Sequence, residues 1–531
     1  MNHDFFSRAE ADPDRVVLTM ANASLPYRAG AVAGRARRIA QWLAAQGLQA
    51  GDSFAVLLEN RVEILETVLA ARLAGLYAAV LGTHLAPPEV VYIVKDSGAR
   101  LVVASARTLP QIEPVLHELG VPCWTVDEHS ATAQVPAFHA AVQSAPVDTN
   151  ADAVDFSERP LGRDLLYSSG TTGRPKGIRK PMLPAMYRTQ PDPEAQGTAR
   201  HMQMGEDTVY LSPAPLYHAA PLRYTLRVLD LGGQAVIMER FDAERALALI
   251  ERHRVTHSQW VPTMLSRMLQ LPPDVRAQHD LSSHRIAIHA AAPCPVPLKQ
   301  AMLDWWGDIL LEYYAGSEGC GTTLINSREW RERPGSVGRA ITGQLHIVGD
   351  DGRELPHGEV GQIYFANGGE FSYLNDDEKN RQAFNAQGWA TYGDIGHVDE
   401  AGYLYLSDRR TDLILSGGVN LYPLEIENAL ASHPAVWEVA VVGVPHADLG
   451  EQPLAVVVLR HGAAATQEAA RGIVAHSGAV LSRGKQPQRL VFVDSLPRLE
   501  TGKLLRRVLK ERYATDPAPG FAVRGQLAAH G

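Results

Sequence analysis

The segment LLYSSGTTGRPKGIRK at residues 165–180 is the part of the chain best suited to binding phosphate. Glycine allows positive φ and close backbone approach, so free N–H groups and hydroxyls can surround a polyanion. The segment lacks the GxxxxGK[ST] pattern of P-loop NTPases. Its apolar lead-in and its basic residues disfavour the alternative of a flexible Gly/Ser linker. The candidate phosphate-binding residues are Ser168, Ser169, Gly170, Thr171, Thr172, Gly173 and Lys176.

Five further segments carry residues of chemical interest. In chain order they are HAAAPCP (289–295), YYAGSEG (313–319), GWATYGDIG (388–396), SDRRTDLILSGGVNLYP (407–423) and PRLETGKLLRR (497–507). Taken alone, Glu318 would be a solvated turn residue and Lys503 a surface lysine, because isolated charged side chains mostly face water. Because all six segments occur in one chain, a functional role for each of them is better supported.

Together these segments resemble, in the same order, the signature motifs of the adenylate-forming superfamily, and in particular its acyl-CoA synthetase branch. Members of that superfamily join a carboxylate to ATP, release pyrophosphate from the resulting acyl-adenylate, and usually pass the acyl group to a thiol. The resemblance covers about Phe5 to Tyr513. It implies an acid–thiol ligase that uses ATP, Mg²⁺ and coenzyme A, with a small-molecule carboxylic acid as the other substrate.

The resemblance also implies a nucleotide site. Tyr314 would stack on adenine, while Asp394 and Arg409 would hold the ribose. Glu318, together with Thr171, would hold Mg²⁺, a hard cation that prefers oxygen ligands and neutralises the leaving pyrophosphate. Besides the loop of residues 168–173 and Lys176, the residues implied in ATP or AMP binding are Ala291, Ala292, Pro293, Tyr314, Ser317, Asp394 and Arg409.

A catalytic lysine and a domain hinge follow from the same resemblance. Lys503 would lie over the carboxylate and the α-phosphate, where a cation stabilises the charge that develops during adenylation. The hinge would fall at Arg410 and Thr411, although related proteins often have Asp or Lys where Thr411 stands. After rotation about this hinge, the loop of Ser416, Gly417 and Gly418 would meet the pantetheine of CoA.

The segment LSPAPLYHAAPL (211–222) resembles the mouth of the acyl pocket, with His218 as a third candidate catalytic residue beside Lys503 and Glu318. No acidic residue occurs in 213–222, and an unpaired ammonium in an apolar pocket is costly. We therefore expect an acid without an α-amino group. Small side chains leave room for a bulky or long acid, whether fatty, steroidal or aryl. The expected acyl-binding residues are His218, Ala219, Ala290, Ala315 and Gly316.

Other functions remain open at this point. The acceptor of the acyl group could be an amine, giving an amide, or a carrier-protein thiol. The reason is that LSRGKQPQRLVFV (481–493) departs from the usual sequence pattern of the superfamily. A non-catalytic nucleotide-binding scaffold is disfavoured by the presence of Lys503, Glu318 and Asp394. A hydrolase is disfavoured because no GxSxG elbow surrounds the candidate serines.

The pattern of apolar runs predicts the elements that must position these residues. Strands at 53–58, 78–82 and 100–105 alternate with helical segments such as 35–48, and the stretch 67–82 reads as a buried helix running into a strand. This rhythm predicts a multi-domain α/β protein whose large N-terminal part consists of parallel-type βαβ subdomains. A small antiparallel β region follows at 338–406.

The C-terminal part is expected to be a small, mobile α+β domain. We expect the N-terminal AMP-binding domain at 1–408 and the C-terminal domain at 409–531, with a loosely ordered tail from about 515. The 531 residues carry a formal net charge of −9, which does not suit a nucleic-acid partner. Three scattered cysteines suit a reducing cytoplasm. We expect neither a signal peptide nor a membrane span, and the resemblance admits a homodimer.

Overall fold

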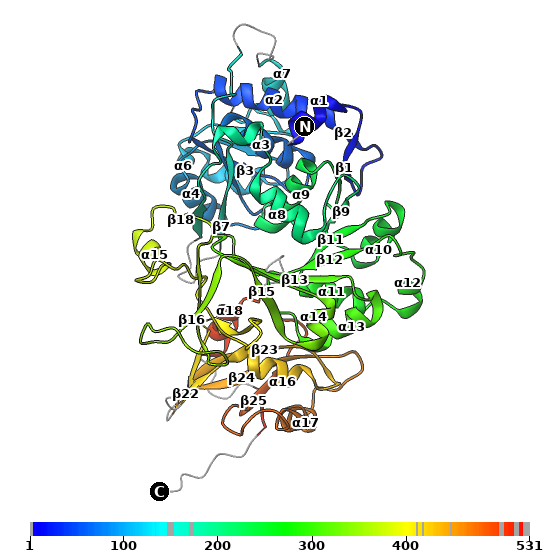
Figure 1. Cartoon of the computed structure of the whole chain (residues 1–531), viewed down its shortest axis with the longest axis vertical. Coiled ribbons are helices and arrows are strands. Elements are labelled where there is room, and N and C mark those ends of the chain that lie inside the picture. The colour runs from blue at the N-terminus through cyan, green and yellow to red at the C-terminus, as the bar shows by residue number, and fades with distance from the viewer. Residues whose placement is uncertain are drawn as a thin grey trace.

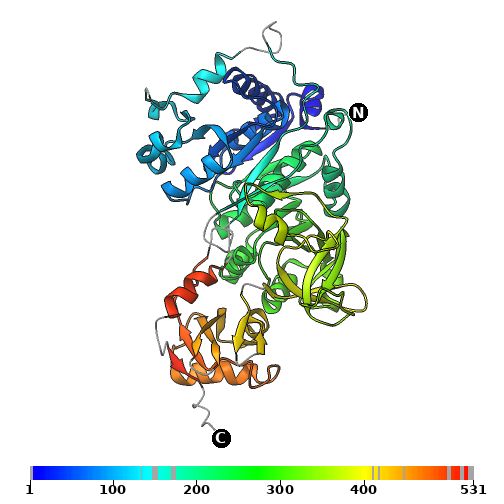
Figure 2. The same ribbon diagram turned by 90° about the vertical axis from the view of Figure 1, so that its left-hand side faces the viewer.

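Three β-sheets with helices on their faces form the chain, and its C-terminal part lies at one end (Figures 1 and 2). The computed structural model describes residues 4–132, 134–145, 153–168, 175–409, 412–416, 419–446, 449–498, 504–514 and 520–523. All statements about the fold below concern these residues. The α/β class expected from the sequence is observed, with parallel strands in the N-terminal part and a small α+β C-terminal part.

The first sheet has seven strands in the order β18-β8-β7-β4-β3-β5-β6. Its five parallel strands are β3 (Ser53–Leu57), β4 (Tyr77–Val80), β5 (Ala99–Ala104), β6 (Cys123–Thr125) and β7 (Arg163–Ser168). The helix α3 (Val62–Ala74) is buried on nearly all sides and leads into β4. The prediction of a buried helix followed by a strand is thus confirmed. The antiparallel strands at the edge are β8 (Lys176–Arg179) and β18 (Ser372–Tyr373).

A second sheet of thirteen strands carries the candidate residues Tyr314, Ala315, Asp394 and Arg409. Its parallel strands are β1 (Val16–Met20), β10 (Gln234–Ile237), β9 (Val209–Ser212), β11 (His257–Trp260), β12 (Ile286–His289) and β13 (Leu310–Ala315). The antiparallel strands are β2 (Tyr27–Arg28) at one edge, then β14 (Thr322–Asn326), β15 (Ser336–Thr342), β16 (Gln344–Val348), β17 (Gly361–Ala366), β19 (Asp394–Val398) and β20 (Leu404–Arg409) beyond β13. The antiparallel region predicted at 338–406 is therefore continuous with the parallel sheet.

Helices cover the faces of these sheets, and their bounds differ in detail from those expected. The helix predicted at 35–48 is α2 (Ala29–Ala45), which begins six residues earlier. Glycines at 30 and 34 weaken the helical signal in its first turns, yet Gly30 lies against Pro13, where a Cβ would be 2.8 Å from the proline Cβ. The other helices near the site are α8 (Pro193–Met202), α9 (Ala219–Asp230), α10 (Ala243–Arg252), α11 (Pro262–Leu269) and α13 (Val296–Trp306).

The C-terminal part has its own sheet and core. Between Arg409 and Ile414 the chain passes from the thirteen-stranded sheet to this third sheet. Its strands are β21 (Ile414–Ser416), β22 (Val419–Leu421), β23 (Val436–His446), β24 (Gly450–Leu459), β25 (Arg489–Phe492) and β26 (Phe521–Ala522). Its helices are α16 (Pro423–Ala431), α17 (Gln467–Ser477) and α18 (Arg506–Ala514).

Of the tail expected beyond residue 515, the structure describes residues 520–523. Phe521 and Ala522 pair antiparallel with β25, and the Phe521 ring lies 5.6 Å from that of Phe492. Within these four residues, Phe521 packs on the edge of the third sheet. No helix in the described ranges combines the length and the apolar character that crossing a bilayer requires.

A buried ion pair joins α3 to α9, the helix that begins at the candidate site. Arg72 on α3 contacts Asp230 at the end of α9 and lies 3.4 Å from Asp192. The Asp230 side chain is buried and also accepts a hydrogen bond from the backbone N–H of Phe5, at 3.1 Å. Burial raises the pKa of Asp230, and Arg72 opposes that rise.

The substitution Arg72→Ala should therefore lower the free energy of unfolding by about 3–5 kcal/mol, because it leaves a buried carboxylate without its cation. Urea unfolding followed by tryptophan fluorescence measures this loss. The matched control is Arg331→Ala, which removes an exposed pair with Asp308 and should cost less than about 1 kcal/mol. Equal losses for the two variants would contradict the structural role given to Arg72.

Candidate active site

One cavity of about 1620 Å³ brings together all but one of the expected residues whose side chains the structure describes. It is lined by β7, β8 and β13, by the start of α9, and by residues of the C-terminal part. The expected residues that line it are Lys176, His218, Ala219, Ala290, Ala291, Ala292, Pro293, Tyr314, Ala315, Gly316, Ser317, Glu318 and Asp394.

Several expected residues lie outside the described part of the chain: Ser169, Gly170, Thr171, Thr172, Gly173, Arg410, Thr411, Gly417, Gly418 and Lys503. The backbones of Ser168 and Arg409 end β7 and β20, but their side chains are outside the description as well. Ser416 ends β21, opposite Gly450, and is not among the residues that line the cavity.

Tyr314 and Asp394 meet at one end of the cavity. The Tyr314 hydroxyl donates a hydrogen bond of 2.7 Å to Asp394 Oδ2. Burial first, and Asp394 second, raise the pKa of Tyr314, so this phenol is a neutral donor at physiological pH. Strand pairing places Arg409 opposite Asp394. The two residues expected to hold a ribose are therefore neighbours in the backbone register.

Tyr392 fills the space beside this pair. Its ring meets that of Tyr314 edge-on at 5.6 Å, and its hydroxyl donates to the Gly321 carbonyl at 2.8 Å. A Cβ on Gly316 would lie 2.3 Å from the Tyr392 ring. Tyr392 thus packs directly on the YYAGSEG turn, and Gly316 permits that contact.

Glu318 presents a carboxylate to the same region. Its Oε1 accepts a hydrogen bond of 2.8 Å from the Tyr373 hydroxyl, and its Oε2 lies 2.6 Å from where a Cβ on Gly316 would be. Mg²⁺ is commonly held by one or two carboxylates together with substrate phosphates. A single oriented carboxylate therefore suits such a cation when it enters with a nucleotide.

Two cationic side chains that line the cavity lie against the turn of residues 316–319. Arg223 on α9 donates to the Ser317 carbonyl at 3.1 Å and pairs with Asp164 at 2.8 Å. Lys180 follows β8, and its ammonium would lie 2.4 Å from a Cβ on Gly319. Burial first, and nearby Arg223 second, lower the pKa of Lys180 to about 8. Neither residue was expected from the sequence, although KGIRK carries two further basic residues after Lys176, at 179 and 180.

His218 caps α9 at the other side of the cavity. Its backbone is extended, with φ of −98°, and the next residue begins the helix. Its Nε2 is buried without a hydrogen-bond partner among the described residues, and its ring lies 4.5 Å from that of Tyr217. Burial lowers the pKa of His218 to about 3. The imidazole is thus neutral and presents a nitrogen that a bound molecule could satisfy.

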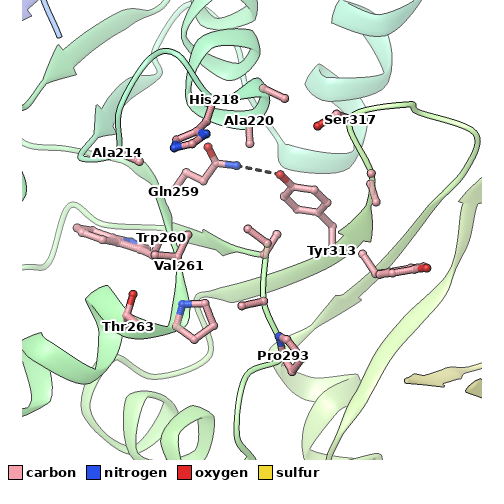
Figure 3. A pocket seen from close by; sticks show the side chains of 18 of the residues that line it. Ala214, His218, Ala220, Gln259, Trp260, Val261, Thr263, Pro293, Tyr313 and Ser317 are labelled. Carbon is pink, nitrogen blue, oxygen red and sulfur yellow. Dashed lines mark hydrogen bonds between the residues drawn. The ribbon is translucent and has the colours of Figure 1, made fainter. Parts of the chain in front are cut away.

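Small residues and an unusual backbone form the wall below His218. Ala290 is buried at the end of β12, and Ala291 has φ of 75°, a left-handed conformation that a residue with a Cβ seldom adopts. Figure 3 shows Gln259 and Tyr313 between the small residues, with a hydrogen bond drawn between them. No role was expected for this pair from the sequence.

The C-terminal part reaches the cavity through the start of α18. Leu504, Leu505, Arg506 and Arg507 line it. Arg506 contacts Glu427 of α16 and lies 3.5 Å from Asp412. The residues that directly follow Lys503 in the sequence are thus held at the cavity by ion pairs within the C-terminal part.

This arrangement, a large α/β part and a small C-terminal part that share one cavity, defines the adenylate-forming class of enzymes. The chain belongs to the AMP-binding enzyme family: residues 5–372 match that family, and residues 425–503 match the AMP-binding enzyme C-terminal domain. The sequence-based assignment to this superfamily is confirmed.

The chain aligns with related proteins over nearly its whole length. The chain is 34% identical to the long-chain-fatty-acid–CoA ligase FadD13 of Mycobacterium tuberculosis, over 91% of this chain and 92% of that protein. It is 29% identical to the 2-succinylbenzoate–CoA ligase of Bacillus subtilis, over 95% and 96%. The structure of ATP-bound MatB from Rhodopseudomonas palustris superposes with a TM-score of 0.83 at 29% identity, covering 97% of this chain and 99% of that one.

The neutral state of His218 makes stability depend on pH. Since an unfolded histidine has a pKa near 6.5, the unfolded chain takes up this proton while folded His218 remains neutral. The free energy of unfolding therefore falls as the pH decreases from about 6.5 toward 3. The variant His218→Asn should reduce that slope by up to about 1.4 kcal/mol per pH unit, as measured by urea unfolding between pH 7 and 4.5.

The control is His461→Asn, at an exposed position of the C-terminal part, which should leave the slope as in the original protein. An unchanged slope in His218→Asn would show that this imidazole titrates alike in both states.

Proposed function

We propose that the protein is an ATP-dependent carboxylate–CoA ligase that forms an acyl-adenylate and then an acyl-CoA thioester. The observation that carries this proposal is the shared cavity, which holds the Tyr314–Asp394 pair and Glu318. Beside them lies the acyl chamber, the part of the cavity lined by His218 and the small residues Ala219, Ala290, Ala315 and Gly316. An acid and a nucleotide held in one cavity react as neighbours, which lowers the entropic part of the barrier. The names of the relatives support the same activity.

In the first half-reaction, an oxygen of the acid attacks the α-phosphorus of ATP, and the bond from that phosphorus to pyrophosphate breaks. Asp394 and Arg409 would hold the ribose, with the Tyr314 hydroxyl fixing the Asp394 carboxylate. The loop of residues 168–173 and Lys176 would surround the phosphates. Lys503 would bridge the carboxylate and the α-phosphate, where a preorganised cation stabilises the developing charge.

Mg²⁺ would be held by Glu318, with Thr171 beside it, and would neutralise the pyrophosphate as it leaves. The hydrogen bond from Tyr373 leaves Glu318 one oxygen directed toward Gly316. This carboxylate would keep its orientation before any cation binds.

In the second half-reaction, the CoA sulfur attacks the acyl carbon, AMP departs and the thiol proton is lost. The C-terminal part would rotate about Arg410 and Thr411, which would withdraw Lys503 and bring Ser416, Gly417 and Gly418 to the pantetheine. His218 would orient the acyl carbonyl as a neutral imidazole. Rotation of one small domain would allow a single cavity to serve both steps.

The acid is proposed to be bulky or long and to lack an α-amino group. Two acidic residues of the cavity lining are already paired with cations: Glu194 with Arg163 and Arg227, and Glu312 with Lys299. They therefore offer little to a substrate ammonium. The relatives are named for long-chain fatty acids, 2-succinylbenzoate and sulfoacetate, which leaves the acyl group to experiment. A cytoplasmic location and a homodimer stay predictions.

Mass spectrometry of the products tests the reaction. The protein is incubated with ATP, Mg²⁺ and a panel of fatty, aryl and steroid acids, with and without CoA. We expect AMP in every productive reaction and acyl-CoA whenever CoA is present. Amide formation with an added amine and no acyl-CoA would favour the amide-synthetase alternative. No consumption of ATP with any acid would overturn the ligase.

The variant Lys503→Ala should slow adenylation by at least about 100-fold, because one preorganised charge is typically worth a factor of 10² to 10³. It should largely spare thioester formation from supplied acyl-AMP. Stopped-flow assays of each half-reaction separate the two effects. Arg512→Ala, at an exposed position of α18, is the matched control and should change neither rate. Equal loss of both half-reactions in Lys503→Ala would refute the exchange of roles by the C-terminal part.

A further inference from the structure

Gln259 and Tyr313 place a polar patch in the middle of the acyl chamber. Both line the cavity, where their strands β11 and β13 lie on either side of β12. Their surroundings are apolar: Trp260 is 1% exposed, Val261 8% and Ala290 8%. Figure 3 shows the two side chains pointing toward one another beside His218 and Ala220. A pocket for an unsubstituted alkyl chain needs no such pair.

A chain of hydrogen bonds orients the pair. The hydroxyl of Tyr210, which is fully buried, donates to Gln259 Oε1 at 3.2 Å, and Gln259 Nε2 donates to the Tyr313 hydroxyl oxygen at 3.0 Å. Tyr210 is not part of the cavity lining, so it supports Gln259 from behind. The amide is thereby fixed with its carbonyl toward Tyr210 and its nitrogen toward Tyr313.

This orientation leaves hydrogen-bond donors directed at the cavity. Burial raises the pKa of Tyr313 to about 12, against the opposing effects of Arg227 and of the hydrogen bond from Gln259. The Tyr313 oxygen therefore acts as acceptor for its neighbours and keeps its own hydrogen. Within the described ranges the second N–H of Gln259, a residue that is 6% exposed, has no acceptor, whereas Tyr224 lies beside the Tyr313 hydroxyl as a further hydrogen-bonding partner. Buried donors without an acceptor are unfavourable and rare.

The charges nearby favour the same kind of ligand. Arg223 and Arg227 both act to lower the pKa of Tyr313, in opposition to the dominant effect of burial. Because Arg223 pairs with Asp164 and Arg227 with Glu194, a ligand atom placed against Tyr313 meets hydrogen-bond donors without an unpaired charge beside them. An electron-rich oxygen satisfies this environment, whereas a methylene group leaves it unsatisfied.

We infer that the acid activated by this protein carries an oxygen acceptor, such as an oxo group, at the position along its acyl part that meets Tyr313 and Gln259. This inference rests on the proposed ligase activity and narrows its substrate class. An unsubstituted fatty acid would fill the chamber but would place methylene groups against these polar side chains. A site built to hydrogen-bond a substrate discriminates against analogues that lack the matching group.

The experiment compares kcat/KM for decanoate with that for a series of oxodecanoates in which the oxo group moves along the chain. The aryl pair 4-oxo-4-phenylbutanoate and 4-phenylbutanoate is added. We expect at least one oxo acid to be favoured over its parent by about tenfold or more. Tyr313→Phe keeps the ring and removes the donor, so it should reduce that preference by about threefold to tenfold.

The variant Gln259→Met should erode the same preference, whereas Tyr403→Phe is the matched control. The Tyr403 hydroxyl donates to Glu329 away from the cavity, and its loss should leave the preference intact. Turnover of the parent acids with equal or better kcat/KM would overturn the inference and leave the ligase standing. An oxo preference that persists in Tyr313→Phe would overturn it too. Absence of turnover with every acid would count against the ligase itself.

Discussion

The alternation of side chains along β13 is the constraint on which the site depends. Successive residues of a strand point to opposite faces, so Tyr313 and Tyr314 are neighbours in sequence that serve different compartments. Tyr313 packs with Tyr224 and bonds Gln259 on the acyl side. Tyr314 bonds Asp394 and packs with Tyr392 on the other side. A shift of one residue in the register of β13 would exchange these roles, and β12 and β14 fix that register on both sides.

Electrostatics divides the cavity in the same way. Lys180 and Arg223 lie against the turn that carries Ser317 and Glu318. A nucleotide bound at this turn would need positive charge near its phosphates. At the acyl side, burial keeps His218 neutral and Tyr313 protonated, so that end offers hydrogen bonds without net charge. An apolar acid with one oxygen acceptor is compatible with such a chamber, and a free ammonium is not.

Much of this could be predicted from the sequence. Strand and helix patterns placed β3, β4, β5 and α3 within a few residues of their observed bounds, because apolar periodicity reports burial directly. Motif resemblance found Glu318 and Asp394. It did not find Gln259 or Tyr373, because each acts through a partner more than 50 positions away, at Tyr313 and Glu318 respectively. Only the strand order and the turn geometry bring those partners together, and neither leaves a local sequence signal.

The central claim is that the acid is activated as an adenylate, and oxygen-isotope transfer tests it most directly. The acid is labelled with ¹⁸O in both carboxylate oxygens and incubated with the protein, ATP, Mg²⁺ and CoA. If carboxylate oxygen attacks the α-phosphorus, AMP acquires one ¹⁸O and the acyl-CoA retains one. Label in inorganic phosphate with formation of ADP, or no label in AMP, would contradict the account.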